Sequence, residues 1–141
     1  MSETVRVEVV SPEEVLYSGD ATMVVTRTLE GGELAFQAGH ASFLGALIEN
    51  RTRLFLADGS VQDIAVHGGF VEVSGSPTTV SILSDAAELA QDIDVEKAKA
   101  DLERHELVLK MEHDEAKLTE AIAGKKAAEI QLETAGVNFT A

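Results

Sequence analysis

Glycine and proline are distributed unevenly along this chain of 141 residues. The segment between Pro77 and Gly124 contains neither residue, whereas both prolines and most of the 11 glycines come before residue 78. Glycine and proline punctuate short strands and tight turns, while a long stretch of Ala, Leu, Glu, Lys and Asp without them sustains unbroken helical hydrogen bonding. The sequence therefore predicts an all-β module followed by a helical one.

The length of the chain suits one ordinary domain or two small ones, and the compositional break favours two. We expect a β-sandwich domain over residues 1–87 and a helical domain over residues 88–141. Two helices alone seldom bury enough apolar surface to offset chain entropy. We therefore expect the helical part to dock, either on the sandwich or on a partner.

Charge and composition exclude several functions. The chain carries 25 acidic residues against 11 basic ones, which gives a net charge of −14, and it has no cysteine. Such a surface repels nucleic-acid phosphates and anionic lipid headgroups, and the lack of cysteine excludes disulfides, thiolate nucleophiles and Cys-ligated zinc. No apolar run approaches the ~20 residues that span a bilayer, and the beginning does not resemble a secretory signal. We expect neither nucleic-acid binding nor direct membrane insertion.

Alternation of apolar and polar residues marks short strands in the first module. It is visible at residues 5–9, 22–27 and 70–73. Asp58-Gly59 is a hairpin signal, because both residue types tolerate positive φ. Gly31-Gly32 and Gly68-Gly69 predict two further sharp reversals. Roughly eight to ten strands at this spacing predict an antiparallel β-sandwich or a flattened barrel.

The helical module reads as an antiparallel hairpin. Asp94 and Asp114 are candidate N-caps, and Gly136 is a plausible stop for the second helix. The expected buried positions of the first helix are Val95, Ala98, Leu102 and Leu109, widened by Leu107 and Met111. Those of the second helix are Leu118, Ala121, Ile122, Ala128 and Leu132. Both stripes are rich in alanine, which buries less apolar area than leucine and predicts weak docking.

Short segments in order across nearly the whole chain resemble successive motifs of the epsilon subunit of rotary F-type ATP synthases. They are residues 9–13, 16–21, 32–34, 39–41, 68–73, 82–88, 92–94 and 116–128. The resemblance implies a ten-stranded sandwich in the central stalk, clamped to the gamma subunit and seated on the ring of c subunits. It also implies a non-catalytic, coupling role on the cytoplasmic face of the cell membrane, as a peripheral part of a proton-translocating complex.

The same resemblance implies that the helical hairpin is a regulatory element. In the family it folds down against the sandwich or extends along gamma toward the catalytic alpha and beta subunits, where it obstructs rotation in the hydrolysis direction. A helix of ~20 residues is ~30 Å long, which suits such a reach. A switch of this kind requires docked and extended states within a few kcal/mol of each other.

Two segments resemble the edge of the family that faces the c ring. Their residues are Leu29, Glu30, Gly31, Gly32, Glu33, Gly39, His40 and Ala41. Glycines let the backbone turn sharply, while Glu33 and His40 can hydrogen-bond to a polar partner. The alternative is a solvated turn position for Glu33 and a structural contact for His40. Ser42 departs from the proline that many relatives have there.

Gly68-Gly69-Phe70 admits two interpretations. It is either a structural hairpin that places Phe70 in the core, which we favour, or a flat surface that the gamma backbone approaches. An obligate partner such as gamma needs an apolar patch on the sandwich. The sequence does not say which residues form that patch.

Some members of the family bind ATP between the two helices. The residues that match the first motif of that site are Ile93, Asp94, Lys97 and Ala98. Lys97 replaces an arginine and lacks the planar fork that grips phosphate, and the expected arginines of the second helix fall at Glu120 and Gly124. We therefore expect no nucleotide cofactor.

No residues stand out as catalytic or metal-binding. The chain has no phosphate-binding G-x-x-x-x-G-K-[ST] loop, and the helical zinc-protease pattern that begins at His105 fails at Leu109. His67 has no obvious carboxylate partner in the sequence. We expect a regulatory subunit rather than an enzyme. The alternative is a free-standing β-sandwich adaptor or ligand-binding module with an appended helical hairpin, and co-purification with gamma and the c ring would discriminate the two.

Overall fold

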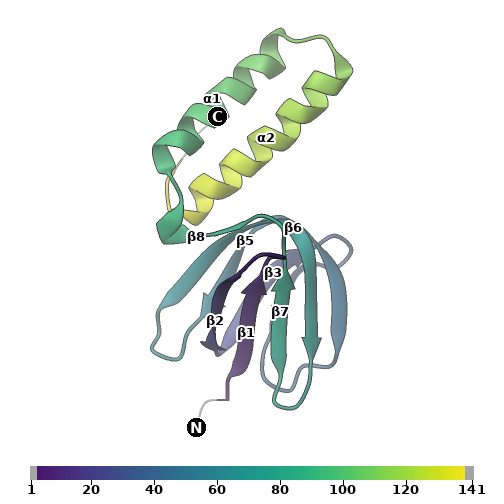
Figure 1. Cartoon of the computed structure of the whole chain (residues 1–141), viewed down its shortest axis with the longest axis vertical. Helices are drawn as coiled ribbons and strands as arrows, with labels where there is room; N and C mark the ends of the chain where they lie inside the picture. The colour runs from purple at the N-terminus through teal and green to yellow at the C-terminus, as the bar shows by residue number, and fades with distance from the viewer. Residues whose placement is uncertain (1–2, 139–141) are drawn as a thin grey trace. The chain divides into compact units, whose positions relative to one another are not determined.

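A computed structural model describes residues 3–138 of the chain. The chain divides into two compact units, Met1–Leu89 and Ala90–Ala141. The strands of the first unit are β1 (Val5–Val10), β2 (Val15–Ala21), β3 (Met23–Thr28), β4 (Gly32–Phe36), β5 (Phe43–Phe55), β6 (Val61–Ser74), β7 (Thr79–Leu83) and β8 (Ala87–Leu89). The second unit holds a 3-10 helix, η1 (Ala90–Asp92), and two α-helices, α1 (Val95–Met111) and α2 (Glu115–Thr134) (Figure 1).

The strands of the first unit form one hydrogen-bonded sheet in the order β2-β1-β7-β6-β5-β3-β4, with β8 beside β6. The sheet folds around a single core and so forms the expected β-sandwich. Its strand pairs are antiparallel apart from β1 and β7, which run in parallel. A parallel pair needs a long connection between its strands, and here β2 to β6 supply it.

Within residues 3–138 the sheet has eight strands, fewer than the ten or so that the resemblance implied. The difference comes from β5 and β6, which are 13 and 14 residues long. One edge of β6 pairs with β8 through Ile64–Val66 and then with β7 through Phe70–Ser74. A single long strand therefore takes part in two portions of the folded sheet.

The reversal expected at Gly68-Gly69 is wrong, because both glycines lie inside β6. Their φ angles of +86° and +121° bend the strand at the point where its neighbour changes from β8 to β7. The favoured placement of Phe70 in the core is wrong for the same reason. The strand continues past the glycines with Val71 pointing inward, so Phe70 points outward and is 54% exposed.

The core of the sandwich follows the alternation seen in the sequence. Val5, Val7 and Val9 of β1 are fully buried. The remaining buried apolar members are Ala21, Val24, Phe36, Leu47, Leu54, Ile64, Val66, Val71, Val73, Val80 and Ile82. Valine and isoleucine predominate, as expected for residues that pack well on a pleated surface.

Local turn signals are confirmed. Asp58-Gly59 joins β5 to β6, with Asp58 Oδ1 accepting a hydrogen bond from the Ser60 amide at 2.9 Å and Gly59 at φ +88°. Gly31 lies in the turn between β3 and β4, and Gly32 begins β4, where it is paired with Thr28. Both signals depend on residues within a few positions of each other, which is why the sequence reveals them.

The expected caps of the helical hairpin are also confirmed. Asp94 Oδ1 accepts a hydrogen bond from the Lys97 amide at 3.1 Å, and Asp114 Oδ2 accepts one from the Lys117 amide at 3.0 Å. Gly136 follows α2 at φ +79°, and the Val137 amide donates to the Leu132 carbonyl at 2.9 Å. This six-to-one hydrogen bond is the signature of a glycine-terminated helix.

The two helices pack against each other along an alanine-rich seam. Ala98 of α1 and Ala121 and Ala128 of α2 are buried. Leu107, Met111 and Ile122, which were expected to be buried, are instead exposed by 57, 69 and 60%. At 100° per residue, Leu107 lies half a turn away from Ala98 and so on the opposite face of α1.

No helix within residues 3–138 is both long enough and apolar enough to cross a membrane.

Candidate functional site

The turn from Leu29 to Glu33 is held by its own hydrogen bonds. Thr28 Oγ1 accepts a hydrogen bond from the Gly31 amide at 2.9 Å and donates one to the Gly32 carbonyl at 3.2 Å. Glu33 forms an exposed ion pair with Arg27 at 3.3 Å across the β3–β4 hairpin. The turn is therefore a defined surface feature, and its leucine is 69% exposed.

The second expected segment, Gly39 to Ala41, follows β4. The Gly39 amide donates to Thr78 Oγ1 at 2.8 Å, which ties this loop to the start of β7. His40 Nδ1 donates to its neighbour's carbonyl, Ala41 O, at 2.7 Å, and the His40 ring stands edge-on to Phe36 with 4.9 Å between centroids. His40 therefore makes the structural contacts of the alternative interpretation, and its use in an interface stays a prediction.

Among the residues that the structure describes, these two segments border different hollows. They flank β4, one before it and one after it. The first borders a hollow of about 490 Å³ that also involves β5 and β6, whereas the second borders one of about 650 Å³ with the turn at residues 75–78. Any partner that contacts both segments has to extend along β4.

Sequence reasoning missed an apolar surface on β5, β6 and β7. We define the apolar patch as Leu29, Leu44, Phe70 and Leu83, whose exposed fractions are 69, 68, 54 and 47%. Phe70 is paired with Ala46 on one side and with Leu83 on the other, so these side chains share one face of the sheet. The amide of Leu29 donates to the Ala46 carbonyl at 2.9 Å, which fixes the β3–β4 turn beside them.

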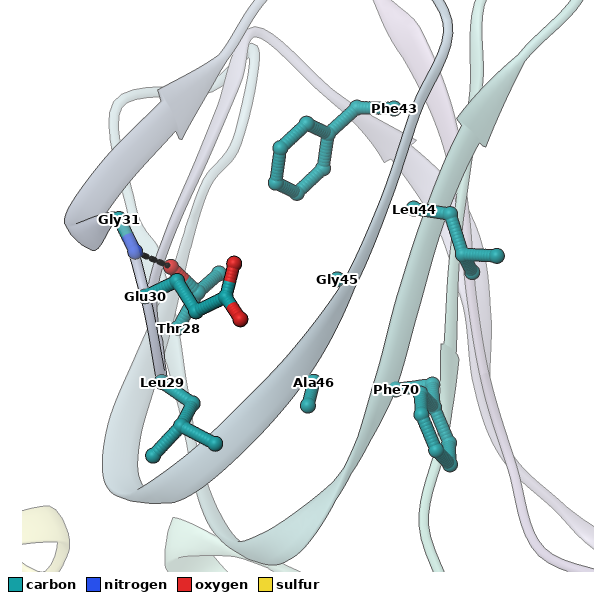
Figure 2. Close-up of a pocket in the computed structure, with 9 residues that line it drawn as sticks. All are labelled: Thr28, Leu29, Glu30, Gly31, Phe43, Leu44, Gly45, Ala46 and Phe70. Carbon is teal, nitrogen blue, oxygen red and sulfur yellow. Dashed lines mark hydrogen bonds between the residues drawn. The ribbon is translucent and has the colours of Figure 1, made fainter.

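Figure 2 shows that Leu29, Leu44 and Phe70 of the apolar patch border the first hollow, with Leu29 and Phe70 on either side of Ala46. A third hollow, of about 290 Å³, is lined by Phe70, Leu83 and Pro12 among others. The signal that could have located this surface was the alternation in β6. Val71 and Val73 point inward, which places Phe70 on the outer face with Glu72.

His67 is a second feature that the sequence did not reveal. Its Nδ1 lies 2.6 Å from Glu49 Oε2 of β5, and its Nε2 lies 2.9 Å from Glu88 Oε2 of β8. Ionised carboxylates only accept hydrogen bonds, so satisfying both contacts requires a proton on each ring nitrogen. Burial lowers the pKa of His67, but the two carboxylates outweigh burial, and the net pKa is raised above the usual 6.5.

The residues expected at a nucleotide site have structural roles in the hairpin. Asp94 caps α1, Ala98 is buried, and Ile93 is only 8% exposed. Lys97 Nζ forms an ion pair with Asp101 at 2.9 Å, and Arg104 contacts the same carboxylate at 3.1 Å. Asp101 raises the pKa of Lys97, while Lys97 and then Arg104 lower the pKa of Asp101.

The place where the family's second-helix arginine was expected is filled by an imidazole. A Cβ atom at Gly124 would overlap the ring of His105 on α1. Glycine at this position lets the ring pack directly against the α2 backbone. The space between the helices is therefore occupied by a side chain of the protein itself.

Comparison with known proteins decides the family. The family described as "ATP synthase, Delta/Epsilon chain, beta-sandwich domain" matches residues 4–90. The chain belongs to this family. An ATP synthase epsilon chain from Shouchella clausii is 42% identical over 118 residues, which cover 84% of this chain and 86% of that one. One from Rhodococcus erythropolis is 50% identical over 95 residues, which cover 67% and 75% of the two chains.

Solved structures agree with the fold of the epsilon-chain family. A chain in the cryo-EM structure of the Euglena gracilis mitochondrial ATP synthase superposes with a TM-score of 0.80 at 23% identity. The match covers 94% of this chain and 81% of that chain. A chain of the Tetrahymena thermophila central stalk and c ring gives a TM-score of 0.57 at 16% identity. At such low identity, both similarities show the fold alone.

Proposed function

We propose that this chain is the epsilon subunit of a rotary F-type ATP synthase and that it couples rotation of the c ring to the catalytic subunits. The observation that carries the proposal is the 42% identity to an epsilon chain over 84% of this chain. In this role the protein is a regulatory subunit with no catalysis of its own. It acts at the cytoplasmic face of the membrane, bound to the complex rather than inserted in the bilayer.

The apolar patch is our candidate surface for the gamma subunit. Four large apolar side chains exposed together on one face are costly in water, and covering them supplies the main favourable term in association. Phe70 lies between the two hollows that border the patch, which suits an aromatic anchor at the centre of an interface. Leu29 belongs both to the patch and to the Leu29–Glu33 turn, so gamma seated on the patch also meets the first residue of that turn.

The Leu29–Glu33 turn and the Gly39–Ala41 loop are our candidate contacts with the c ring. Transmission of torque requires contact loops that do not yield under load. The Thr28 hydroxyl, the Arg27–Glu33 ion pair and the Gly39–Thr78 hydrogen bond each fasten these loops to strands. These contacts support a rigid base rather than an adaptable one.

The helical hairpin is proposed to inhibit ATP hydrolysis by extending to the alpha and beta subunits. Each helix carries its own N-cap, so the hairpin can keep its structure when it moves as a body. The alanine-rich seam gains less free energy on burial than a leucine seam would. This favours a small free-energy difference between alternative positions of the hairpin, as a switch requires.

Reconstitution tests the proposed function. The full chain should restore ATP-driven proton pumping to a bacterial ATP synthase depleted of its epsilon chain. A shortened chain that ends at Leu89 should restore pumping while raising the rate of ATP hydrolysis several-fold, because the inhibiting hairpin is removed. If the full chain does not restore coupling, the proposal is contradicted. If hydrolysis is unchanged on truncation, only the inhibitory role of the hairpin is contradicted.

A further inference from the structure

The strand β8 is the last element of the sheet unit, and the chain passes from it directly into η1 and α1. It is three residues long, and its pairing with β6 covers Ile64 to Val66. A strand of this length has few backbone hydrogen bonds to hold it. Side-chain contacts therefore weigh heavily in whether it stays in place, and such short edge segments open at low cost.

His67 supplies a polar side-chain contact that joins β8 to the long strands, in addition to the packing of Ala87 and Leu89 against the core. The ring lies between Glu49 of β5 and Glu88 of β8 and is only 13% exposed. One imidazole thus connects three strands. The two glutamates lie 18 and 21 residues away from the histidine in the sequence.

This bridge changes with the protonation of the ring. An imidazolium donates two hydrogen bonds, one to each carboxylate, whereas neutral imidazole has a single donor and a single acceptor. A carboxylate cannot donate to that acceptor nitrogen. Loss of the proton therefore removes one of the two contacts and leaves two like-charged glutamates facing the same ring.

The contact that fails is expected to be the one to Glu88. The remaining proton stays where the hydrogen bond is shorter, which is on Nδ1 facing Glu49 at 2.6 Å rather than on Nε2 facing Glu88 at 2.9 Å. Glu49 belongs to β5, which is 13 residues long and paired on both sides. Glu88 belongs to the three-residue β8, so β8 bears the loss.

We infer that His67 is a protonation-dependent latch that holds β8, the strand leading into the helices, against the rest of the sheet. The inference rests on the geometry of this chain alone and is independent of the proposed role in ATP synthase. The latch is closed while the ring is charged. It loosens as the pH rises through the titration of His67.

The direction in which pH affects the latch follows from the direction of the pKa shift of His67. The carboxylates raise the pKa of His67 in the latched form, so the latch is fully present below the ordinary histidine value and is lost as the pH rises through the elevated one. The equilibrium constant for opening increases by up to tenfold for every unit by which the pKa of the latched form exceeds that of the open form.

Other charged groups lie on the elements packed around the bridge. They include Asp20 on β2, Arg27 on β3, Arg51 and Arg53 on β5, Asp63 and Glu72 on β6 and Asp85 in the loop before β8. Arg27 is paired with Glu33 and Arg53 with Asp63. Arg51 lies two residues from Glu49 and across Ala65 from Glu88. Arg51 partly offsets the repulsion between Glu49 and Glu88, so β8 loosens but is not driven off the sheet.

One anchor near β8 does not titrate. Ser84 Oγ hydrogen-bonds to the carbonyls of Gly68 and Ala86, at 2.7 and 2.9 Å. The amide of His67 also donates to the Ala86 carbonyl at 2.9 Å. The loop before β8 therefore keeps its place, and the change is confined to Ala87–Leu89.

NMR of the full chain tests the latch. The ring nitrogens of His67 should titrate above the usual histidine value, and amide hydrogen exchange should report opening of β8. After correction for intrinsic exchange rates, protection of the Glu88 and Ala65 amides, which face each other across the β6–β8 pair, should fall several-fold between pH 6 and pH 9. Protection in β1 and β7 should not change. Equal protection of β8 at both pH values would overturn the inference.

Variants separate this histidine from general effects of pH. His67→Gln keeps a donor but cannot be protonated, so the pH dependence of β8 protection should vanish. His40→Gln is the matched control and should retain it. Glu88→Gln is a second variant that leaves the ring and β5 intact, and it should lower the titration point of His67 and weaken the dependence. If β8 protection in His67→Gln depends on pH as it does in the unaltered chain, the inference is overturned. If His67→Gln does not fold, the same result in Glu88→Gln overturns it.

Discussion

Gly69 is the residue that allows β6 to bend. Its φ of +121° is one that residues with a side chain rarely adopt, and a Cβ atom there would overlap the carbonyl oxygen of Leu83. The strand can change partners from β8 to β7 only because the backbone of β7 approaches this closely. The same glycine turns Phe70 outward and so contributes to the apolar patch.

Substitution of Gly69 by alanine is expected to cost much more stability than the same change at Gly59. Gly59 also has a positive φ, +88°, but nothing lies within 4 Å of where its Cβ would be. Gly59→Ala should lower the free energy of unfolding only by the cost of a left-handed backbone conformation, about 1–2 kcal/mol. Gly69→Ala adds a clash with rigid backbone and should cost about 4 kcal/mol or more, as the largest single-residue effects do.

Urea unfolding of both variants, followed by circular dichroism, measures this difference in the free energy of unfolding. Equal losses at the two glycines would mean that β7 can move away from β6 at little cost. The close approach of the two strands would then not be what fixes the bend.

At the scale of elements, the local signals were predictable and the long-range ones were not. The caps Asp94 and Asp114 and the turn at Asp58-Gly59 each involve residues within three positions of one another, so the sequence reveals them directly. The partners of His67 lie on strands that are distant in the chain, and no pattern near His67 encodes which strand becomes its neighbour. The outward position of Phe70 follows from the alternation in β6, but the neighbours that complete the apolar patch do not.

The length of β5 and β6 was unpredictable for a related reason. Glycine ordinarily weakens a strand or ends it, and Gly68-Gly69 therefore suggested a reversal. Pairing with β5 on one edge continues past the glycines, since Leu47 is paired with Gly69 and Ala46 with Phe70. Tertiary pairing overrides the local signal, and two expected strands become one.

The helical hairpin is expected not to bind nucleotide. Its candidate cations Lys97 and Arg104 both contact Asp101, and the ring of His105 lies against Gly124 where a phosphate-binding arginine was expected. A bound phosphate would have to displace Asp101 from Lys97 and Arg104. It would also be repelled by a chain whose net charge is −14. Calorimetric titration of the full chain with Mg-ATP should give no binding heat up to millimolar concentration. A submillimolar dissociation constant would contradict this.

The whole molecule consists of a sheet unit, which carries the proposed interaction surface, and a separately capped helical hairpin. The division was predictable from the glycine and proline distribution, because backbone propensity differs along the whole chain. The candidate interface was not, because it depends on which face of a folded sheet stays uncovered. Family membership supports the role of the whole chain, and the apolar patch is its proposed contact with a partner.

The most direct test of the central claim is the affinity of the full chain for the gamma subunit of an epsilon-depleted ATP synthase. Phe70→Asp places a charge in the middle of the apolar patch, and Val61→Asp is the matched control, since Val61 is an exposed residue, 39%, at the far end of the same strand. Both variants should keep the circular dichroism spectrum of the original chain.

The account predicts that Phe70→Asp weakens binding to gamma by about 30-fold or more, equivalent to the roughly 2 kcal/mol expected of a central anchor. Val61→Asp should change the affinity by less than about threefold. If the two variants bind gamma with the same affinity as the unaltered chain, the apolar patch is not the surface by which this protein joins the central stalk.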